Sequence, residues 1–111
     1  MHLLMGSLLR MYKILVSNKY LKDVEEVFSY IAFSLYNIDA AHKLKEKLNT
    51  EIEKLKKYPF VNLPMITKQK YLYEYRKVKV GNYYIIYYVD NDTVRISRLV
   101  YSKRDFDNLI I

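Results

Sequence analysis

Apolar and polar residues recur along the chain in patterns that predict the element order β-α-α-β-β-β. Apolar positions alternate over residues 12–16, which predicts a short strand. From residue 19 to about residue 35, apolar side chains recur at three- and four-residue steps, which is typical of an amphipathic helix. A second such stripe runs from residue 39 to about residue 57. The first stripe comprises Leu21, Val24, Phe28, Ile31 and Leu35, and the second Ala41, Leu44, Leu48, Ile52 and Leu55.

Polar residues and prolines mark the ends of these two helices. Ser17 or Asn18 is expected to cap the first helix, and Asn37 or Asp39 the second, because their side-chain oxygens accept from free helix amides. Because only a few residues connect the two predicted helices, we expect them to form an antiparallel helical hairpin. The mixed charges at helical spacing indicate solvated outer faces, not acid–base chemistry. Pro59 and Pro64 predict an irregular loop at residues 60–71.

Gly81 and Asn82 lie between two runs of β-branched and aromatic residues, which predicts a β-hairpin with a two-residue turn. The expected register pairs Val80 with Tyr83, which also places Lys77 opposite Ile86. One face of the hairpin then forms a core: Val78, Val80, Tyr83, Ile85, Tyr87 and Val89. The other face is basic and aromatic: Tyr75, Lys77, Lys79, Tyr84, Ile86 and Tyr88.

A last strand is expected from residue 93 to about residue 101, followed by a helical turn within residues 102–109. If Val89 pairs with Val94, Arg95 and Ser97 join the basic face, and a bulge is expected near Arg98. The predicted fold class is α+β: an N-terminal strand, an antiparallel helical hairpin, then a three-stranded antiparallel sheet. Since the helical hairpin can cover only one face of the sheet, we expect the opposite, basic face to be open.

Composition narrows the class of protein. The chain of 111 residues is long enough for one domain with its own core, expected at residues 11–111, after a flexible extension at residues 1–10. It has no cysteine, which favours a reducing cytoplasm. No apolar run approaches the ~20 residues of a membrane span. The net charge of +7 indicates nucleic acid, the ribosome, an acidic protein or an anionic surface as partner, or no partner at all.

Conventional catalytic patterns are lacking. His2 and His42 stand alone without metal-ligand spacing, and two glycines cannot make a phosphate loop, so neither a metal nor a cofactor is expected. The basic face is the remaining candidate. Its cations neutralise phosphate, and its tyrosines either stack on bases or fill the core. Such a face can cleave RNA without metal by stabilising charge on the phosphate. Alternatively, it only docks another polypeptide.

The chain resembles the RelE/ParE superfamily, the toxins of type II toxin–antitoxin pairs, over residues 11–109. The most specific similarity lies in RKVKVGNYYIIY, residues 76–87, and RLVYSKRDFDNL, residues 98–109. The resemblance implies functional roles for Lys77 and Lys79 in a K-x-K strand, and for Arg104 after the last strand. This sequence departs at Tyr84, where RelE-like members have an arginine, and at Tyr101, where many have a histidine. It also departs near Ile110, where they have a tyrosine.

The resemblance implies three alternatives for activity. The leading expectation is an endoribonuclease that cleaves mRNA on the ribosome without metal. The catalytic residues would be Lys77, Lys79, Arg104 and Tyr101, and the substrate-binding residues Arg76, Tyr84, Arg95, Arg98 and Lys103. The second is a ParE-like poison of DNA gyrase, and the third a degenerate relative that only binds its partner. All three imply a cognate antitoxin with an acidic or amphipathic segment.

Overall fold

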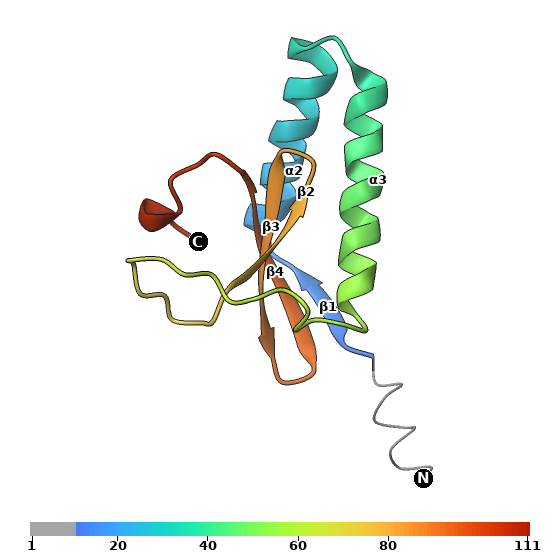
Figure 1. Cartoon of the computed structure of the whole chain (residues 1–111). Helices are drawn as coiled ribbons and strands as arrows, with labels where there is room; N and C mark the ends of the chain where they lie inside the picture. The colour runs from blue at the N-terminus through green and yellow to red at the C-terminus, as the bar shows by residue number, and fades with distance from the viewer. Residues whose placement is uncertain (1–10) are drawn as a thin grey trace.

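The computed structural model describes residues 11–111, so the extension expected at residues 1–10 lies outside the described residues. A four-stranded sheet has the order β1-β4-β3-β2, and a pair of long helices packs on one of its faces (Figure 1). The strands are β1 Lys13–Val16, β2 Arg76–Val80, β3 Tyr83–Asp90 and β4 Thr93–Tyr101. This confirms the predicted α+β class and element order.

The strand register is the one that the turn residues predicted. Val80 pairs with Tyr83 and Lys77 with Ile86 across the first turn, and Val89 pairs with Val94 across the second. Gly81 has φ +58°, a conformation that favours glycine. The register shifts after Ile86, which confirms a bulge beside Arg98. β1 joins the outer edge of β4 in parallel, an orientation that the alternation of its residues did not indicate.

The helices begin where the caps were predicted. α2 is Asn18–Ser29, and the Ser17 hydroxyl accepts from the Tyr20 amide at 2.9 Å. α3 is Ile38–Leu55, and the Asn37 side chain accepts from the Ala40 amide at 3.1 Å. The predicted stripe of α3 is confirmed: Ala41, Leu48, Ile52 and Leu55 are buried, and Leu44 packs against the core.

The predicted stripe of the first helix is wrong at both ends. Leu21 and Leu35 are 57% and 54% exposed, whereas Tyr20 is 5% exposed. The physical reason at the far end is a π-helix, Tyr30–Ser34, that follows α2 directly. Its wider turns, closed by the Leu35 amide on the Tyr30 carbonyl at 3.0 Å, rotate the following residues away from the α-helical stripe.

Two apolar clusters hold the layers together. The larger lies between the helices and the sheet and includes Leu48, Leu55, Ile85, Tyr87 and Ile96. The smaller lies on the opposite sheet face, which was expected to be open. There Ile86, Val100 and Leu109 are buried, because the chain after β4 turns back under the sheet and ends in a 3-10 helix, η2 Phe106–Asn108. The expectation of an uncovered basic face is therefore wrong in part.

Hydrogen bonds anchor this C-terminal segment. The Tyr71 hydroxyl lies 3.1 Å from the Phe106 carbonyl and 2.8 Å from that of Leu109, and donates its single hydrogen to one of them. The Arg98 guanidinium donates to the Ile110 carbonyl at 2.5 Å. The loop between α3 and β2 and the C-terminal segment therefore form a second cover for the sheet. Both lie to one side of the strands in Figure 1.

Candidate functional site

Lys77 occupies the centre of the basic face, between two aromatic rings. Its ammonium nitrogen lies 4.4 Å from the ring centroids of both Tyr84 and Phe106. The two rings meet edge to face at 5.5 Å. Cation–π attraction at this distance stabilises the ammonium group in place. The C-terminal segment thus supplies one wall of the site around Lys77 through Phe106. The sequence patterns did not single out Phe106.

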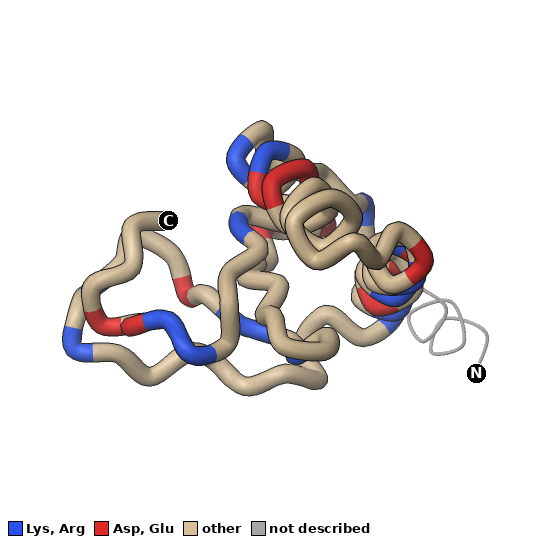
Figure 2. The backbone as a smooth tube through the Cα atoms, turned by 90° about the horizontal axis from the view of Figure 1, so that it is seen from above, with Lys and Arg blue, Asp and Glu red and all other residues tan. Residues whose placement is uncertain are grey.

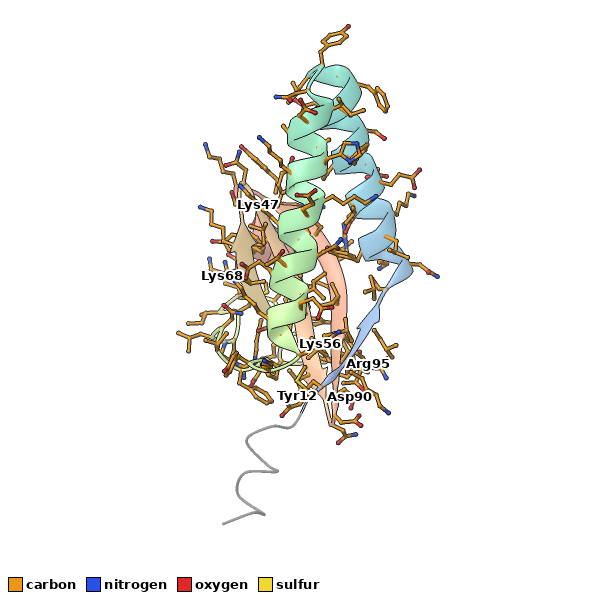
Figure 3. The ribbon with its side chains drawn as sticks, turned by 90° about the vertical axis from the view of Figure 1, so that its right-hand side faces the viewer. Tyr12, Lys47, Lys56, Lys68, Asp90 and Arg95 are labelled. Atoms are coloured by element: carbon orange, nitrogen blue, oxygen red, sulfur yellow. The ribbon has the colours of Figure 1, made fainter. Side chains whose placement is uncertain are left out.

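Lys79 lies one pleat further along β2 and is exposed. It lines a groove of about 400 Å³ between β2 and α3, together with Lys43 and Lys47, which the sequence analysis missed. The signal for these two was their i, i+4 spacing on one face of α3. Glu46 and Glu51 line the same groove, and Figure 3 shows Lys47 projecting from α3. The groove offers ammonium groups to a carboxylate or phosphate.

Lys103 and Arg104 lie in the turn after β4, and both are exposed. The Ser102 amide donates to the Asn82 carbonyl at 2.8 Å, which holds this turn beside the β2–β3 turn. The Arg104 amide donates to the Tyr101 carbonyl at 3.0 Å. Both predicted cations are therefore placed at the end of the sheet where Lys79 also lies.

Tyr101 does not join Lys77. It pairs across β3–β4 with Tyr83, and the two rings meet at 5.9 Å. Tyr83 packs against the core between sheet and helices, so Tyr101 lies on the helix side of the sheet. Burial raises the pKa of Tyr83, and the nearby hydroxyls of Tyr30 and Tyr101 raise it further. Tyr101, which was expected to act in catalysis together with Lys77, is thus separated by the sheet from the Lys77 ammonium group.

The three arginines expected to bind substrate before the end of β4 are each held by contacts within the chain. Arg76 donates to the Asn62 carbonyl at 2.6 Å and to Glu74 at 2.7 Å. Arg95 forms an ion pair with Asp90 at 3.2 Å, and Figure 3 shows both near the same end of the sheet.

Arg98 makes the third of these ion pairs. It contacts Asp23 of α2 at 2.7 Å, and both side chains are largely buried. Of these three arginines, Arg95 retains the most exposed side chain, 41% against 11% for Arg76 and 16% for Arg98. Arg76 and Arg98 therefore position the loop and the C-terminal segment.

A tyrosine cluster extends the basic face beyond the C-terminal segment. Tyr73 and Tyr88 stack with centroids 4.1 Å apart and an interplanar angle of 8°, and Tyr75 meets both edge to face. Burial raises the pKa values of Tyr75 and Tyr88. Tyr73 is 45% exposed and leaves part of its surface free for a further flat group. Sequence analysis missed Tyr73, although it alternates with Tyr71 and Tyr75 ahead of β2.

Residues 11–111 contain no group of three or more His, Asp or Glu side chains placed to hold a metal ion. His42 packs edge to face against Phe28 at 5.1 Å, within the helical layer. Among the helices of the described residues, none is both long and apolar enough to cross a membrane.

Comparison with solved structures shows the same fold. The toxin–antitoxin pair ParDE of P. aeruginosa contains a chain that matches with a TM-score of 0.68 at 11% identity, over 85% of this chain and 99% of that chain. RelBE2 of Mycobacterium tuberculosis matches with a TM-score of 0.54 at 17% identity, over 82% and 98%. DinJ–YafQ of E. coli matches with a TM-score of 0.55 at 18% identity, over 82% and 92%.

Comparison of sequences identifies the family. No curated protein matches this chain. The model of the ParE toxin of type II toxin–antitoxin systems, parDE, matches residues 14–106, which include both long helices and all of the described strands except Lys13 of β1. The chain therefore belongs to the family of ParE toxins of type II toxin–antitoxin systems.

Proposed function

We propose that this ParE-family toxin inhibits growth by binding DNA gyrase and not by cleaving RNA. The proposal rests on one observation: Lys77 and Tyr101 lie on opposite sides of the sheet. Metal-free cleavage requires a cation and a proton-exchanging group at the same phosphate, within hydrogen-bond reach. The ParE-like part of the superfamily, which the sequence resembles, is the part whose members poison gyrase.

The immediate surroundings of Lys77 support the same choice. Its ammonium group is already in contact with two rings, and Ile86 beneath it is fully buried. Tyr84, the expected substrate-binding residue on this side, has its ring in contact with both Lys77 and Phe106. A phosphate that bound the ammonium group would compete with these two ring contacts. A protein partner, in contrast, can bind the covered face without rearranging it.

Ribosome-dependent cleavage of mRNA is the second candidate. Lys77 and Lys79 alternate on one side of β2, and the turn that carries Arg104 is held beside the β2–β3 turn. Three cations on this part of the molecule could neutralise an extended phosphate backbone, which supports this candidate. The candidate requires that another group, from the ribosome or the RNA itself, supply the proton exchange.

A cognate antitoxin is the proposed partner in either case. The chain has a net charge of +7, and three lysines outnumber two glutamates around the groove between α3 and β2, which is lined by Lys43, Lys47, Lys79, Glu46 and Glu51. An acidic or amphipathic antitoxin segment would be attracted to such a groove and would neutralise part of this charge. Mixing the purified chain with the product of the adjacent reading frame tests this proposal. The complex is expected to weaken when Lys79 is changed to Glu.

Induction of the toxin in a growing culture separates the two candidates. DNA synthesis and protein synthesis are followed by incorporation of labelled thymidine and methionine. Gyrase poisoning predicts that thymidine incorporation falls first and that chromosomal breaks appear, with methionine incorporation initially unchanged. An early fall in methionine incorporation with cleaved transcripts would refute the proposal.

Two lysine variants sharpen the interpretation. Lys79→Ala removes a cation that RNA cleavage needs, so under gyrase binding the same order of events is expected. Lys54→Ala is a matched control, because Lys54 is an exposed lysine of α3 paired with Glu51 at 3.0 Å. Cleaved transcripts that are lost in Lys79→Ala and retained in Lys54→Ala would establish the second candidate instead.

A further inference from the structure

The tip of the helical hairpin differs in chemistry from the rest of the surface. Residues 29–38 contain no Asp, Glu, Lys or Arg, although 28% of the chain is charged. Figure 2, viewed from above, shows the connection between the two helices free of charged residues, while the helices themselves carry both signs. Large apolar side chains are exposed on this segment: Tyr30 54%, Phe33 65%, Leu35 54%, Tyr36 92% and Ile38 51%.

Local backbone geometry holds these side chains outward. The π-helix Tyr30–Ser34 rotates the end of the first helix relative to an α-helical stripe, so Phe33 does not join the core. Tyr36 has φ +51°, which is rare for a residue with a bulky side chain. Such strain persists only where the surrounding structure enforces it, and it concentrates at functional positions. The tip therefore presents Tyr36 as a projecting knob.

A groove on α2 and the π-helix ends at Ser34, two residues before this knob. It has a volume of about 600 Å³, runs along the outer side of α2 into the π-helix, and is lined by Tyr30 and Phe33 in its apolar part. Lys22 and Glu26 line its polar part. A tyrosine from another molecule would fit this chemistry, because its ring would contact the aromatic pair and its hydroxyl would reach the charged side chains.

We propose that the free toxin forms a two-fold symmetric dimer through this tip, with Tyr36 of each chain in the α2 groove of the other. Because the groove ends at Ser34, two residues before Tyr36, an antiparallel arrangement would bring both pairs together at once. Residue i then contacts residue j and j contacts i, which is the requirement for a closed two-fold contact.

The exposed area agrees with a second copy as occupant. With ~150–250 Å² for a large side chain, the five exposed fractions amount to roughly 500–800 Å² per chain. Two patches that face each other with all of this area bury roughly 1,000–1,600 Å² in total, between the lower bound and the standard size of a specific interface. The area is therefore sufficient for a dimer whose population depends on concentration.

Charge also favours this site of contact. Two chains with a net charge of +7 repel each other, and repulsion between exposed charges is screened beyond ~8 Å at physiological salt. The tip lies at the far end of a molecule 54 Å long, away from the strands that carry the basic face (Figure 1). Contact through the uncharged tip keeps the two basic faces apart, whereas contact through the sheet would not.

Sedimentation equilibrium of the purified chain over a wide concentration range tests the proposal. The wild type is expected to shift from monomer to dimer mass as concentration rises. Tyr36→Glu should raise the dissociation constant by about 30-fold or more, the effect of losing one central contact residue. Since Tyr36 is 92% exposed, this variant should keep its circular dichroism spectrum and melting temperature. Wild-type chain that remains monomeric throughout would overturn the proposal.

A matched control distinguishes the tip from general surface hydrophobicity. Ile66 is 99% exposed in the loop before β2, far from the tip in sequence, so Ile66→Glu adds the same charge and should leave the dissociation constant unchanged. Equal effects of Ile66→Glu and Tyr36→Glu would overturn the proposal. Co-sedimentation with neutral phosphatidylcholine vesicles tests whether the tip binds lipid instead of a second chain. Binding of a monomer to vesicles that Tyr36→Glu abolishes would assign the tip to lipid and reject the dimer.

Discussion

The ion pair between Arg98 and Asp23 joins α2, β4 and the C-terminal segment. The Arg98 guanidinium donates to both carboxylate oxygens of Asp23, at 2.7 and 3.2 Å, and the Leu99 amide donates to the same carboxylate at 3.0 Å. The two side chains are only 16% and 13% exposed. Asp23→Ala should therefore leave a largely buried guanidinium and a strand amide without their acceptor.

The expected loss can be estimated from these contacts. Removing one partner of a buried ion pair costs ~3–5 kcal/mol. Because Arg98 keeps the Ile110 carbonyl and some solvent contact, the lower end applies, about 3 kcal/mol. For a domain of this size, the melting temperature should fall by roughly 12 °C. Asp23→Asn keeps an acceptor for Leu99, so its loss should be about half as large.

Urea unfolding followed by circular dichroism measures these differences. A double-mutant cycle with Arg98→Met should show a coupling of about 2 kcal/mol, because the double variant leaves no unpaired charge. Glu51→Ala is the matched control, since the Glu51–Lys54 pair is 29% and 64% exposed and should contribute less than ~1 kcal/mol. If Asp23→Ala cost no more than Glu51→Ala, the structural role assigned to Arg98 would be refuted.

Three further predictions concern stability. Tyr87→Phe removes a buried hydroxyl that donates to the Pro59 carbonyl at 2.7 Å, so unfolding in urea should require about 1–2 kcal/mol less free energy. Burial, with Asp23 nearby, raises the pKa of Tyr20 to about 12. The neutral form is therefore favoured by folding, and this contribution is present below pH ~10 and is lost as pH rises toward about 12. Absorbance titration should show several late tyrosines, of which Tyr20→Phe removes one that titrates near pH 12. Gly81→Ala should destabilise by roughly 1–2 kcal/mol through its φ of +58° alone, since an added Cβ would meet only Leu44, at 4.0 Å; an unchanged urea midpoint would contradict this.

Local patterns were sufficient to predict most of the fold. The pair Gly81 and Asn82 determines the hairpin register, and with it which face each residue of β2 and β3 occupies. The spacing of apolar residues in α3 predicted the buried side of that helix correctly. These features are readable because turn geometry and helical periodicity depend on neighbours in the sequence.

Features that depend on distant contacts were not predictable in the same way. Asp23 and Arg98 are 75 positions apart, and nothing near either residue indicates its partner. The covering of Ile86 by Leu109 depends on how the chain after β4 turns, and a short segment has too few residues to show periodicity. The π-helix arises within an apparently regular stripe, which is why Leu35 was wrongly assigned to the core.

The candidate site was predicted in its residue types but only partly in its arrangement. Lys77, Tyr84 and Lys79 lie where the hairpin register placed them. Tyr101 follows the bulge of β4 and faces the helix side, and Phe106 enters from beyond the predicted strands. The roles of these residues in target binding remain predictions, and they depend on the target itself.

The most direct test of gyrase binding uses purified components. The toxin is added to gyrase, ATP and relaxed plasmid, and in parallel to ribosomes programmed with mRNA, and both nucleic acids are separated on gels. Gyrase binding predicts gyrase-dependent linear or nicked plasmid after protein removal, together with intact mRNA. Unaltered plasmid together with cleaved mRNA would contradict it.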